Sequence, residues 1–217
     1  MSEVDSESLR EQKKAKSRRR ILEAAREIFF RDGFMHANLD EVAQRAGVAK
    51  GTLYRYFDNK AELYVAVLAH NGEIFQEKMR ECAATRGVDP PDLIRRVGRF
   101  YFEHWTTNRD YFQIFWAMEN QSVIGELPVG VVDEVTRLWS RCVEIVAQIV
   151  QRGVDEGFFR RCDPWEVADI LWTLANGLIQ SETSPAHRRL RRRRLEHTFT
   201  DAVDLVLEGL ATLAKPG

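Results

Sequence analysis

The chain has 217 residues, 44% of them hydrophobic, so it is long enough for one domain of ordinary size and a smaller one. Its three cysteines are far apart and lack metal-ligand spacing, which argues against a disulfide framework or a zinc site and favours a reducing compartment. The first residues are too polar for a signal peptide, and no apolar run reaches the roughly 18–20 residues that span a bilayer. We therefore expect a cytoplasmic protein with no membrane partner, no cofactor and no metal.

The net charge is only −1, but the charge is unevenly distributed. Between Lys13 and Lys60 there are 12 basic and 6 acidic residues, so this segment carries +6 and the remainder of the chain −7. An asymmetry of this size is typical of a segment that meets a polyanion.

Strand signals are almost absent and apolar residues recur with the helical period, so the sequence predicts an all-α fold. The first strong helix ends at Asp32–Gly33, and its apolar stripe consists of Ile21, Leu22, Ala25, Ile28 and Phe29. A second, short helix follows Asn38, which is expected to form a capping box with Glu41. Gly47 ends that helix and a third opens near Lys50, an arrangement typical of a helix-turn-helix.

The faces of the third helix can be separated at 100° per residue. Leu53 and Phe57 point inward and Val48 fills the angle between the two short helices. The outer side carries residues that no core requires: Gly51, Thr52 and Arg55, flanked by Tyr54 and Tyr56. Their donors and flat surfaces suit base edges, thymine methyl groups and phosphate oxygens.

The rest of the chain also has the pattern of helices. Pro90–Pro91, the Gly125–Gly130 segment, Gly153–Gly157 and Ser184–Pro185 separate them. The expected helices run from about 61 to the low eighties, from Pro90, over 111–118, from 131 to about 153, and over roughly 164–182 and 187–213.

Residues 18–65 resemble the N-terminal domain of the tetracycline-repressor (TetR) family of transcriptional regulators. The resemblance rests on Gly33-Phe34, Val42-Ala43, Ala46-Gly47-Val48, Gly51-Thr52-Leu53-Tyr54, Tyr56-Phe57 and Lys60. It implies a recognition helix in which Lys50, Thr52 and Tyr54 contact bases, and Arg55, Tyr56 and Lys60 contact phosphates. Lys50 and Lys60 depend on the resemblance more than on the helical wheel. Ala49 departs from the family pattern, because it lacks the hydroxyl that caps this helix.

The resemblance also implies three domain ranges. We expect a basic, flexible N-terminal arm over residues 1–17 and a DNA-binding domain over 18–62. A ligand-binding and dimerisation domain is expected over 63–217.

Aromatic residues are abundant in the C-terminal helices. At helical spacing each one suits a core, but family members carry an effector cavity in this bundle, so the set is a candidate lining for an apolar or aromatic ligand. His104 and Asn176 lie on largely apolar helices, as core residues or as polar anchors in that pocket. The full candidate set is Phe100, Tyr101, His104, Trp105, Phe112, Phe115, Trp116, Trp139, Trp172 and Asn176.

The helix over 164–182 is apolar around most of its circumference, which indicates covering on two sides. A second subunit would cover one of them, and Ala168, Ala175 and Gly177 would allow close approach. The family resemblance likewise implies a homodimer built on the last two helices, which predicts a palindromic operator in double-stranded DNA. The basic run at 188–194 is interpreted as the start of the last long helix rather than as a second nucleic-acid site.

These features predict a ligand-responsive DNA-binding regulator, in the first instance a repressor that a lipophilic small molecule releases from its operator. An activator, or a regulator with its ligand as corepressor, remains open. An α-helical enzyme is disfavoured because the five histidines are scattered and no catalytic grouping stands out. A sequence-independent architectural protein would bind DNA with little dependence on Tyr54.

Overall fold

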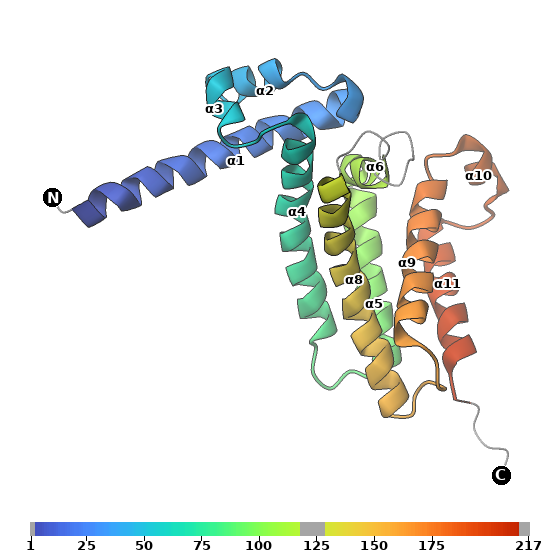
Figure 1. Cartoon of the computed structure of the whole chain (residues 1–217). Coiled ribbons are helices and arrows are strands. Elements are labelled where there is room, and N and C mark those ends of the chain that lie inside the picture. The colour runs from blue at the N-terminus through green and yellow to red at the C-terminus, as the bar shows by residue number, and fades with distance from the viewer. Residues whose placement is uncertain (1–2, 118–128, 213–217) are drawn as a thin grey trace, which may run out of the picture. The chain divides into compact units, whose positions relative to one another are not determined.

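The computed structural model describes residues 3–117 and 129–212, and the elements in this part of the chain are helices (Figure 1). The helices are α1 (Glu3–His36), α2 (Leu39–Arg45), α3 (Lys50–Tyr54), α4 (Lys60–Ala83), α5 (Pro90–Thr107), α6 (Arg109–Ala117), α8 (Val129–Asp155), α9 (Pro164–Ser181), α10 (Pro185–Leu190) and α11 (Leu195–Leu210). An isolated antiparallel bridge joins Phe159 to Ala211. The all-α prediction is confirmed, and none of the described helices is long and apolar enough to cross a membrane.

The chain forms two compact units. The first contains Met1–Gly72 and Gln113–Thr136, and the second contains Glu73–Phe112 and Arg137–Gly217. Helix α4 contributes to both, because the division falls at Gly72 within it. The domain boundary expected after residue 62 also falls inside α4, so no linker marks it.

In the first unit, α2 packs against α1 and α3 packs against α2 (Figure 1). Gly33 adopts the left-handed backbone (φ 72°) that breaks the helical path near the end of α1, as its position predicted. The core contains fully buried side chains from α1, α3 and α4, with the Phe29 ring edge-on to Tyr64 at a centroid distance of 5.0 Å.

The start of α2 differs in part from the expected capping box. The Asn38 side chain caps the helix by accepting a hydrogen bond from the backbone N–H of Asp40 (2.8 Å). Glu41 does not complete the box, because its carboxylate forms two bonds with Arg31 of α1 (2.7 and 2.8 Å). Arg31 lowers the pKa of the Glu41 carboxyl through these bonds. Glu41 therefore joins α2 to α1.

The flexible arm expected over residues 1–17 is helical instead, since α1 begins at Glu3. The segment has no Gly or Pro, and its Leu, Glu, Gln, Lys, Arg and Ala residues have high helix propensity. The basic side chains of this segment thus lie on a helix rather than on a flexible arm.

In the second unit, α5, α9 and α11 contact one another (Figure 1). Pro90 occupies the first turn of α5, and Asp163 caps α9 by accepting hydrogen bonds from the N–H groups of Trp165 and Glu166. The Phe159 ring packs so closely on Gly153 of α8 that a Cβ there would lie 2.2 Å from the ring.

The helix expected over 187–213 is two helices. α10 ends at Leu190, and Arg191 and Arg194 have extended backbone before α11 begins at Leu195. The basic run at 188–194 is therefore split between the end of a short helix and a non-helical connection, and does not begin a long helix.

Candidate nucleic-acid interface and effector cavity

The turn between α2 and α3 sets the orientation of the third helix. Gly47 has φ 63°, a backbone conformation that favours glycine, whereas the Arg20 guanidinium beside it is the end of a flexible side chain that could move away from a Cβ. The backbone N–H of Val48 bonds to the carbonyl of Ala43 (3.0 Å). Ala49 occupies the N-cap of α3 without a side-chain hydrogen bond, as its methyl side chain predicts.

Two buried side chains, one on α3 and one just after its end at Tyr54, lie on the inner side of this segment. Leu53 and Phe57 are 1% and 2% exposed, which agrees with the sequence prediction. On the outer side Tyr54 is 42% exposed, Arg55 is exposed and Thr52 is half-buried. The structure thus brings a phenol, a guanidinium and a hydroxyl to the outside of one short helix.

Tyr56 is held against α1 rather than standing free. Its hydroxyl donates a hydrogen bond to the main-chain carbonyl of Lys14 (3.2 Å). The Arg18 guanidinium of α1 lies over the Phe57 ring, 5.6 Å from its centroid. These contacts brace the end of α3 against α1.

Lys50 forms an exposed ion pair with Asp40 of α2, with 2.6 Å between Nζ and Oδ1. The hydrogen bond to Asp40 raises the pKa of Lys50. Contact with an anion through Lys50 requires this pair to open, and exposed pairs of this kind contribute little to stability.

Lys60, the first residue of α4, has a structural position that the sequence did not indicate. Its Nζ donates hydrogen bonds to the carbonyls of Met35 (2.9 Å) and Ala37 (3.3 Å), and it lies over the Phe34 ring at 5.2 Å. Lys60 therefore connects the start of α4 to the turn between α1 and α2. Its ammonium group is only partly available to an external anion.

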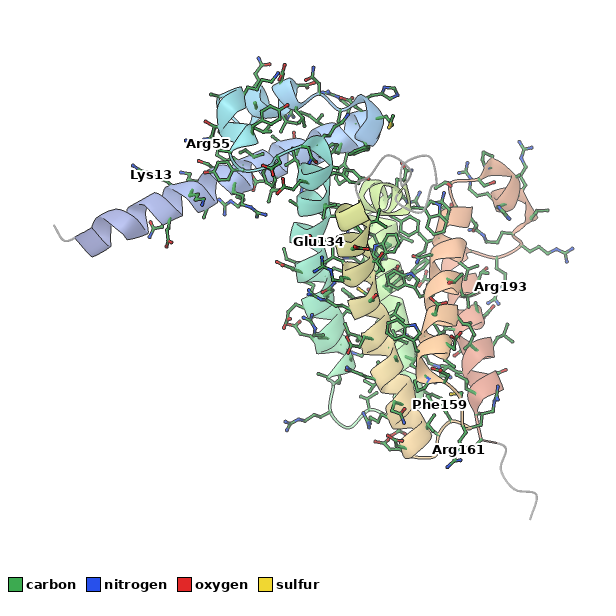
Figure 2. All side chains as sticks on the ribbon, viewed as in Figure 1. Lys13, Arg55, Glu134, Phe159, Arg161 and Arg193 are labelled. Carbon is green, nitrogen blue, oxygen red and sulfur yellow. The ribbon has the colours of Figure 1, made fainter. Side chains whose placement is uncertain are left out.

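The helical N-terminal half of α1 adds exposed cations to the first unit. Lys13, Lys14 and Lys16 are exposed, and no ion pair involves them among the described residues; Figure 2 labels Lys13 on α1 and Arg55 at the end of α3. The sequence had singled out this basic run, but had placed it on a flexible arm.

The second unit contains a small apolar cavity of about 40 Å³ among α4, α5, α8, α9 and α11. Of the ten predicted ligand residues, Tyr101 and Trp172 line it. Most of the lining is aliphatic and was not predicted, because single aliphatic residues on a helix give no signal that separates a cavity from a core. The complete lining is Met79, Ile94, Val97, Gly98, Tyr101, Val143, Val146, Ala168, Leu171, Trp172, Ala175, Phe199 and Val203.

Asn176 is buried next to this cavity, and its polar group is satisfied. The Tyr101 hydroxyl donates a hydrogen bond to Asn176 Oδ1 (2.6 Å). A second buried amide, Gln76, donates to the carbonyl of Leu138 (2.9 Å). Both therefore bond within the protein, as buried polar groups generally do.

Four other ring-bearing candidates, Phe100, His104, Trp105 and Phe112, pack in one cluster and are not among the residues that line the cavity. The rings of Phe100, His104 and Trp105 surround Phe75 at centroid distances of 5.3, 4.6 and 5.3 Å, and Phe112 contacts Trp105. Burial lowers the pKa of His104, and the positive charge of Lys78 lowers it further. Trp116 and Trp139 are half-buried, and the side chain of Phe115 lies outside the described set.

A roomier groove lies along α4, α5 and α8, with a volume of about 480 Å³. Its guanidinium groups come from Arg80, Arg141 and Arg152, and its apolar surface includes Ile145 and Ile149. No sequence pattern predicted this groove, because its arginines are far apart along the chain. In the described part of the chain, no group of His, Cys, Asp and Glu side chains could hold a metal ion.

Comparison with known proteins finds one family whose model matches residues 21–67, the bacterial regulatory proteins of the tetR family. The HTH-type transcriptional activator FasR of Mycolicibacterium smegmatis is 41% identical over 84 residues, 39% of this chain and 38% of FasR. The HTH-type transcriptional regulator YhgD of Bacillus subtilis is 29% identical over 166 residues, 73% of this chain and 80% of YhgD.

Among solved structures, the transcriptional regulator FadR from Bacillus subtilis in complex with stearoyl-CoA superposes with a TM-score of 0.71. The match covers 88% of this chain and 98% of FadR at 17% identity, which establishes a common fold alone. The helix-turn-helix is thus the part of the chain with the clearest relatives in sequence, and the helical bundle is related by its fold.

Proposed function

Because the chain belongs to the tetR family of bacterial regulatory proteins, we propose that it is a ligand-responsive DNA-binding transcriptional regulator, acting as a repressor. The observation that carries this proposal is the outer side of α3. Thr52 and Tyr54 of α3 and its C-cap Arg55 are presented there, while Leu53 of α3 and Phe57 just beyond it are buried. These groups suit the major groove, where side chains read base edges and contact phosphates.

The test is DNA binding by the full chain, measured by fluorescence anisotropy on duplexes from the region upstream of its own gene, with random-sequence duplex as competitor. Replacing Tyr54 with Ala removes a base-reading side chain and is expected to cost about 1–3 kcal/mol of preference for the operator. Loss of preference with little loss of random-sequence binding supports a regulator. Equal binding to all sequences by the wild type supports an architectural protein instead.

The proposed regulator binds as a homodimer. Ile170 of α9 and Leu205 of α11 are 54% and 68% exposed, and α9 and α11 contact each other, so a second subunit would bury this apolar face. Gly177 is exposed on α9 and would allow close approach, whereas Ala168 and Ala175 line the cavity of their own subunit. A two-fold dimer requires a palindromic operator with half-sites about 34–36 Å apart.

The proposed effector is a lipophilic small molecule that enters the apolar cavity. At about 40 Å³ the cavity is smaller than the roughly 300–1,000 Å³ of ligand pockets, so binding has to separate the surrounding helices. Helix α4 offers a route for the response, because Met79 lines the cavity and Lys60, at its other end, is bonded to the turn before α2. The likeness to a stearoyl-CoA complex makes fatty acyl compounds the first effectors to test.

Whether the effector weakens or strengthens operator binding is a separate question, since the similar protein FasR is named an activator. Native mass spectrometry identifies what co-purifies with the chain, and operator titrations with that compound measure the response. Weaker operator binding with the compound supports release of a repressor, and tighter binding supports a corepressor or an activator.

A further inference from the structure

The arginine segment, residues 188–194, is the most basic part of the molecule. Its sequence RRLRRRR contains six arginines and no acidic residue, so it carries +6 in a chain whose net charge is −1. The segment comprises the end of α10 and the connection to α11, and Figure 2 labels Arg193 at this place. The proposed function leaves this segment without a role.

Two of the six arginines anchor the segment to its own unit. The Arg191 guanidinium forms a hydrogen-bonded ion pair with Glu182 (2.6 Å) and a hydrogen bond to the Ser181 hydroxyl (3.2 Å), and its side chain is only 15% exposed. Arg193 pairs with Asp201 of α11. Ion pairs at Arg191 and Arg193 thus hold the connection between α10 and α11 in place.

The other four arginines, Arg188, Arg189, Arg192 and Arg194, are exposed. In the part of the chain that the structure describes, none of the four forms an ion pair or a side-chain hydrogen bond. Between residues 191 and 194 paired and unpaired arginines alternate along the connection. The segment therefore presents unneutralised guanidinium groups from an anchored backbone.

Stability of the fold does not account for this composition. The four arginines at 191–194 immediately precede the N-terminus of α11, where the helix dipole disfavours positive charge. Arg194 occupies the N-cap without capping the helix, where Ser, Thr, Asp or Asn would stabilise it. Six like charges also repel one another. An external anion would offset these unfavourable terms.

We propose that the arginine segment is a second DNA-binding surface, which contacts phosphates of the duplex through Arg188, Arg189, Arg192 and Arg194. This inference rests on the proposed function, because bound DNA is the polyanion that the molecule is built to meet. The basic residues are all arginine, whose guanidinium fork matches phosphate oxygens. Phosphate contacts of this kind add affinity without reading sequence.

The composition of the segment favours a nucleic acid over a lipid surface. An interfacial membrane helix needs a broad apolar face, usually with aromatic residues. Within α10 and the following connection the large apolar residue is Leu190 alone, 76% exposed, and residues 183–198 contain no Phe, Tyr or Trp.

The experiment compares the full chain with a variant in which Arg188, Arg189, Arg192 and Arg194 are replaced by Gln. Fluorescence anisotropy on a labelled random-sequence duplex of about 40 base pairs, at a series of salt concentrations, gives the slope of log K against log salt. Each phosphate contact contributes about 0.9 to this slope. The slope of the variant is expected to be smaller in magnitude by up to about 3.6 per subunit, with binding at least about tenfold weaker at low salt.

A matched variant controls for the loss of four positive charges. It replaces Arg86, Arg96, Arg99 and Arg161, four exposed arginines of the same unit, by Gln, and its slope is expected to stay closer to that of the wild type. Replacing the four arginines of the segment by Lys keeps the charge and is expected to preserve most of the slope. Should the Gln variant unfold, as judged by circular dichroism, the pairs Arg188/Arg189 and Arg192/Arg194 are replaced separately.

The outcomes separate this proposal from the proposed function. A wild-type slope in the Gln variant, together with operator preference that depends on Tyr54, overturns the second surface and leaves the regulator intact. Equal weakening by the matched variant shows a general charge effect and also overturns it. Binding to phosphatidylglycerol-containing vesicles that the Gln variant loses, with DNA binding unchanged, assigns the segment to membranes instead. A wild-type chain that binds no duplex contradicts both proposals.

Discussion

At the scale of single residues, the contacts of Lys60 give its charge a structural role in addition to the predicted phosphate contact. Its side chain combines two hydrogen bonds to main-chain carbonyls with a contact over the Phe34 ring. Met35 and Ala37, which supply the carbonyls, lie more than twenty residues earlier in the chain, so no local pattern announces the interaction. Removing the ammonium loses two hydrogen bonds from a charged donor, a kind of bond that contributes more than one between neutral groups.

Replacing Lys60 with Met is therefore expected to lower the free energy of unfolding by about 1–3 kcal/mol, measured by urea denaturation. Lys50→Met is the matched control, because Lys50 has an exposed ion pair with Asp40, and its removal is expected to change stability less than removal of Lys60 does. A Lys60→Met chain with wild-type stability but a smaller salt slope for DNA binding would assign Lys60 to phosphate contact alone.

His104 makes a prediction about pH. Burial lowers its pKa from the ordinary value of 6.5, with a smaller contribution from Lys78, and the ring packs against Phe75. As the pH falls through 6.5, the unfolded chain binds a proton that the folded His104 resists, so the folded state loses stability; above this range both states are neutral and His104 has no effect.

The free energy of unfolding should thus decline between about pH 7.5 and about pH 5, and His104→Gln should remove part of that decline. Chemical denaturation at a series of pH values provides the measurement. The four histidines other than His104 do not all need to be silent, since the comparison isolates the difference between the two chains. An identical decline in both chains would show that protonation of His104 is not opposed by the fold.

At the scale of helices, Gly98 has a distinctive place in α5. It lies in the helix interior and lines the cavity, and an added Cβ would be 3.6 Å from Phe199 and 3.7 Å from Val203, which is ordinary contact. Gly98→Ala is expected to raise the free energy of unfolding by about 0.5–1 kcal/mol, because Ala is the better helix former and the methyl group fills cavity space.

The same methyl group should weaken binding of any effector that uses the cavity, as measured by isothermal titration calorimetry. Gly72→Ala in α4 is the matched control, since nothing lies within 4 Å of its added Cβ and it does not line the cavity. It should gain helix stability without losing effector affinity. Unchanged affinity in Gly98→Ala would place the effector elsewhere, with the groove beside Arg141 as the next site to test.

The helices show which features can be predicted from sequence. Gly33, Gly47, Asn38 and Ala49 act through local backbone geometry, and the structure agrees with their predicted roles at the helix ends. Leu53 and Phe57 were predicted by helical period, which reports burial directly.

Features that depend on distant partners were not predictable. Glu41 forms its bonds with Arg31 instead of closing a capping box, and residues 191–194 interrupt the last helix. Similarly, aromatic composition marked the second unit as rich in rings, but the choice between core and cavity depends on how five helices meet. Among the candidates whose side chains the structure describes, Tyr101 and Trp172 line the cavity. The identity of the DNA-contacting residues stays a prediction.

At the scale of the whole molecule, the proposed regulator depends on association of two chains. A single helix-turn-helix offers few base contacts, and a dimer doubles them and imposes the spacing of a palindrome. The exposed apolar residues Ile170 and Leu205 lie on two helices that contact each other, where a second copy would remove both side chains from water. Because both side chains are already partly buried, burial of the remainder of each contributes about 1–2 kcal/mol.

Replacing both Ile170 and Leu205 with Lys should therefore raise the dimer dissociation constant by roughly 100-fold or more, because apolar burial is lost and like charges meet across the two-fold axis. Sedimentation velocity measures the change in mass at micromolar concentration, and operator affinity should fall with it, since each chain then binds one half-site. Ile74→Lys is the matched control: Ile74 is 54% exposed on α4, outside the proposed interface, and its replacement should leave the dimer intact. If the double variant sediments as the wild-type dimer while Ile74→Lys dissociates, the dimer is formed by the face that includes α4, and the half-site spacing must be derived from that arrangement.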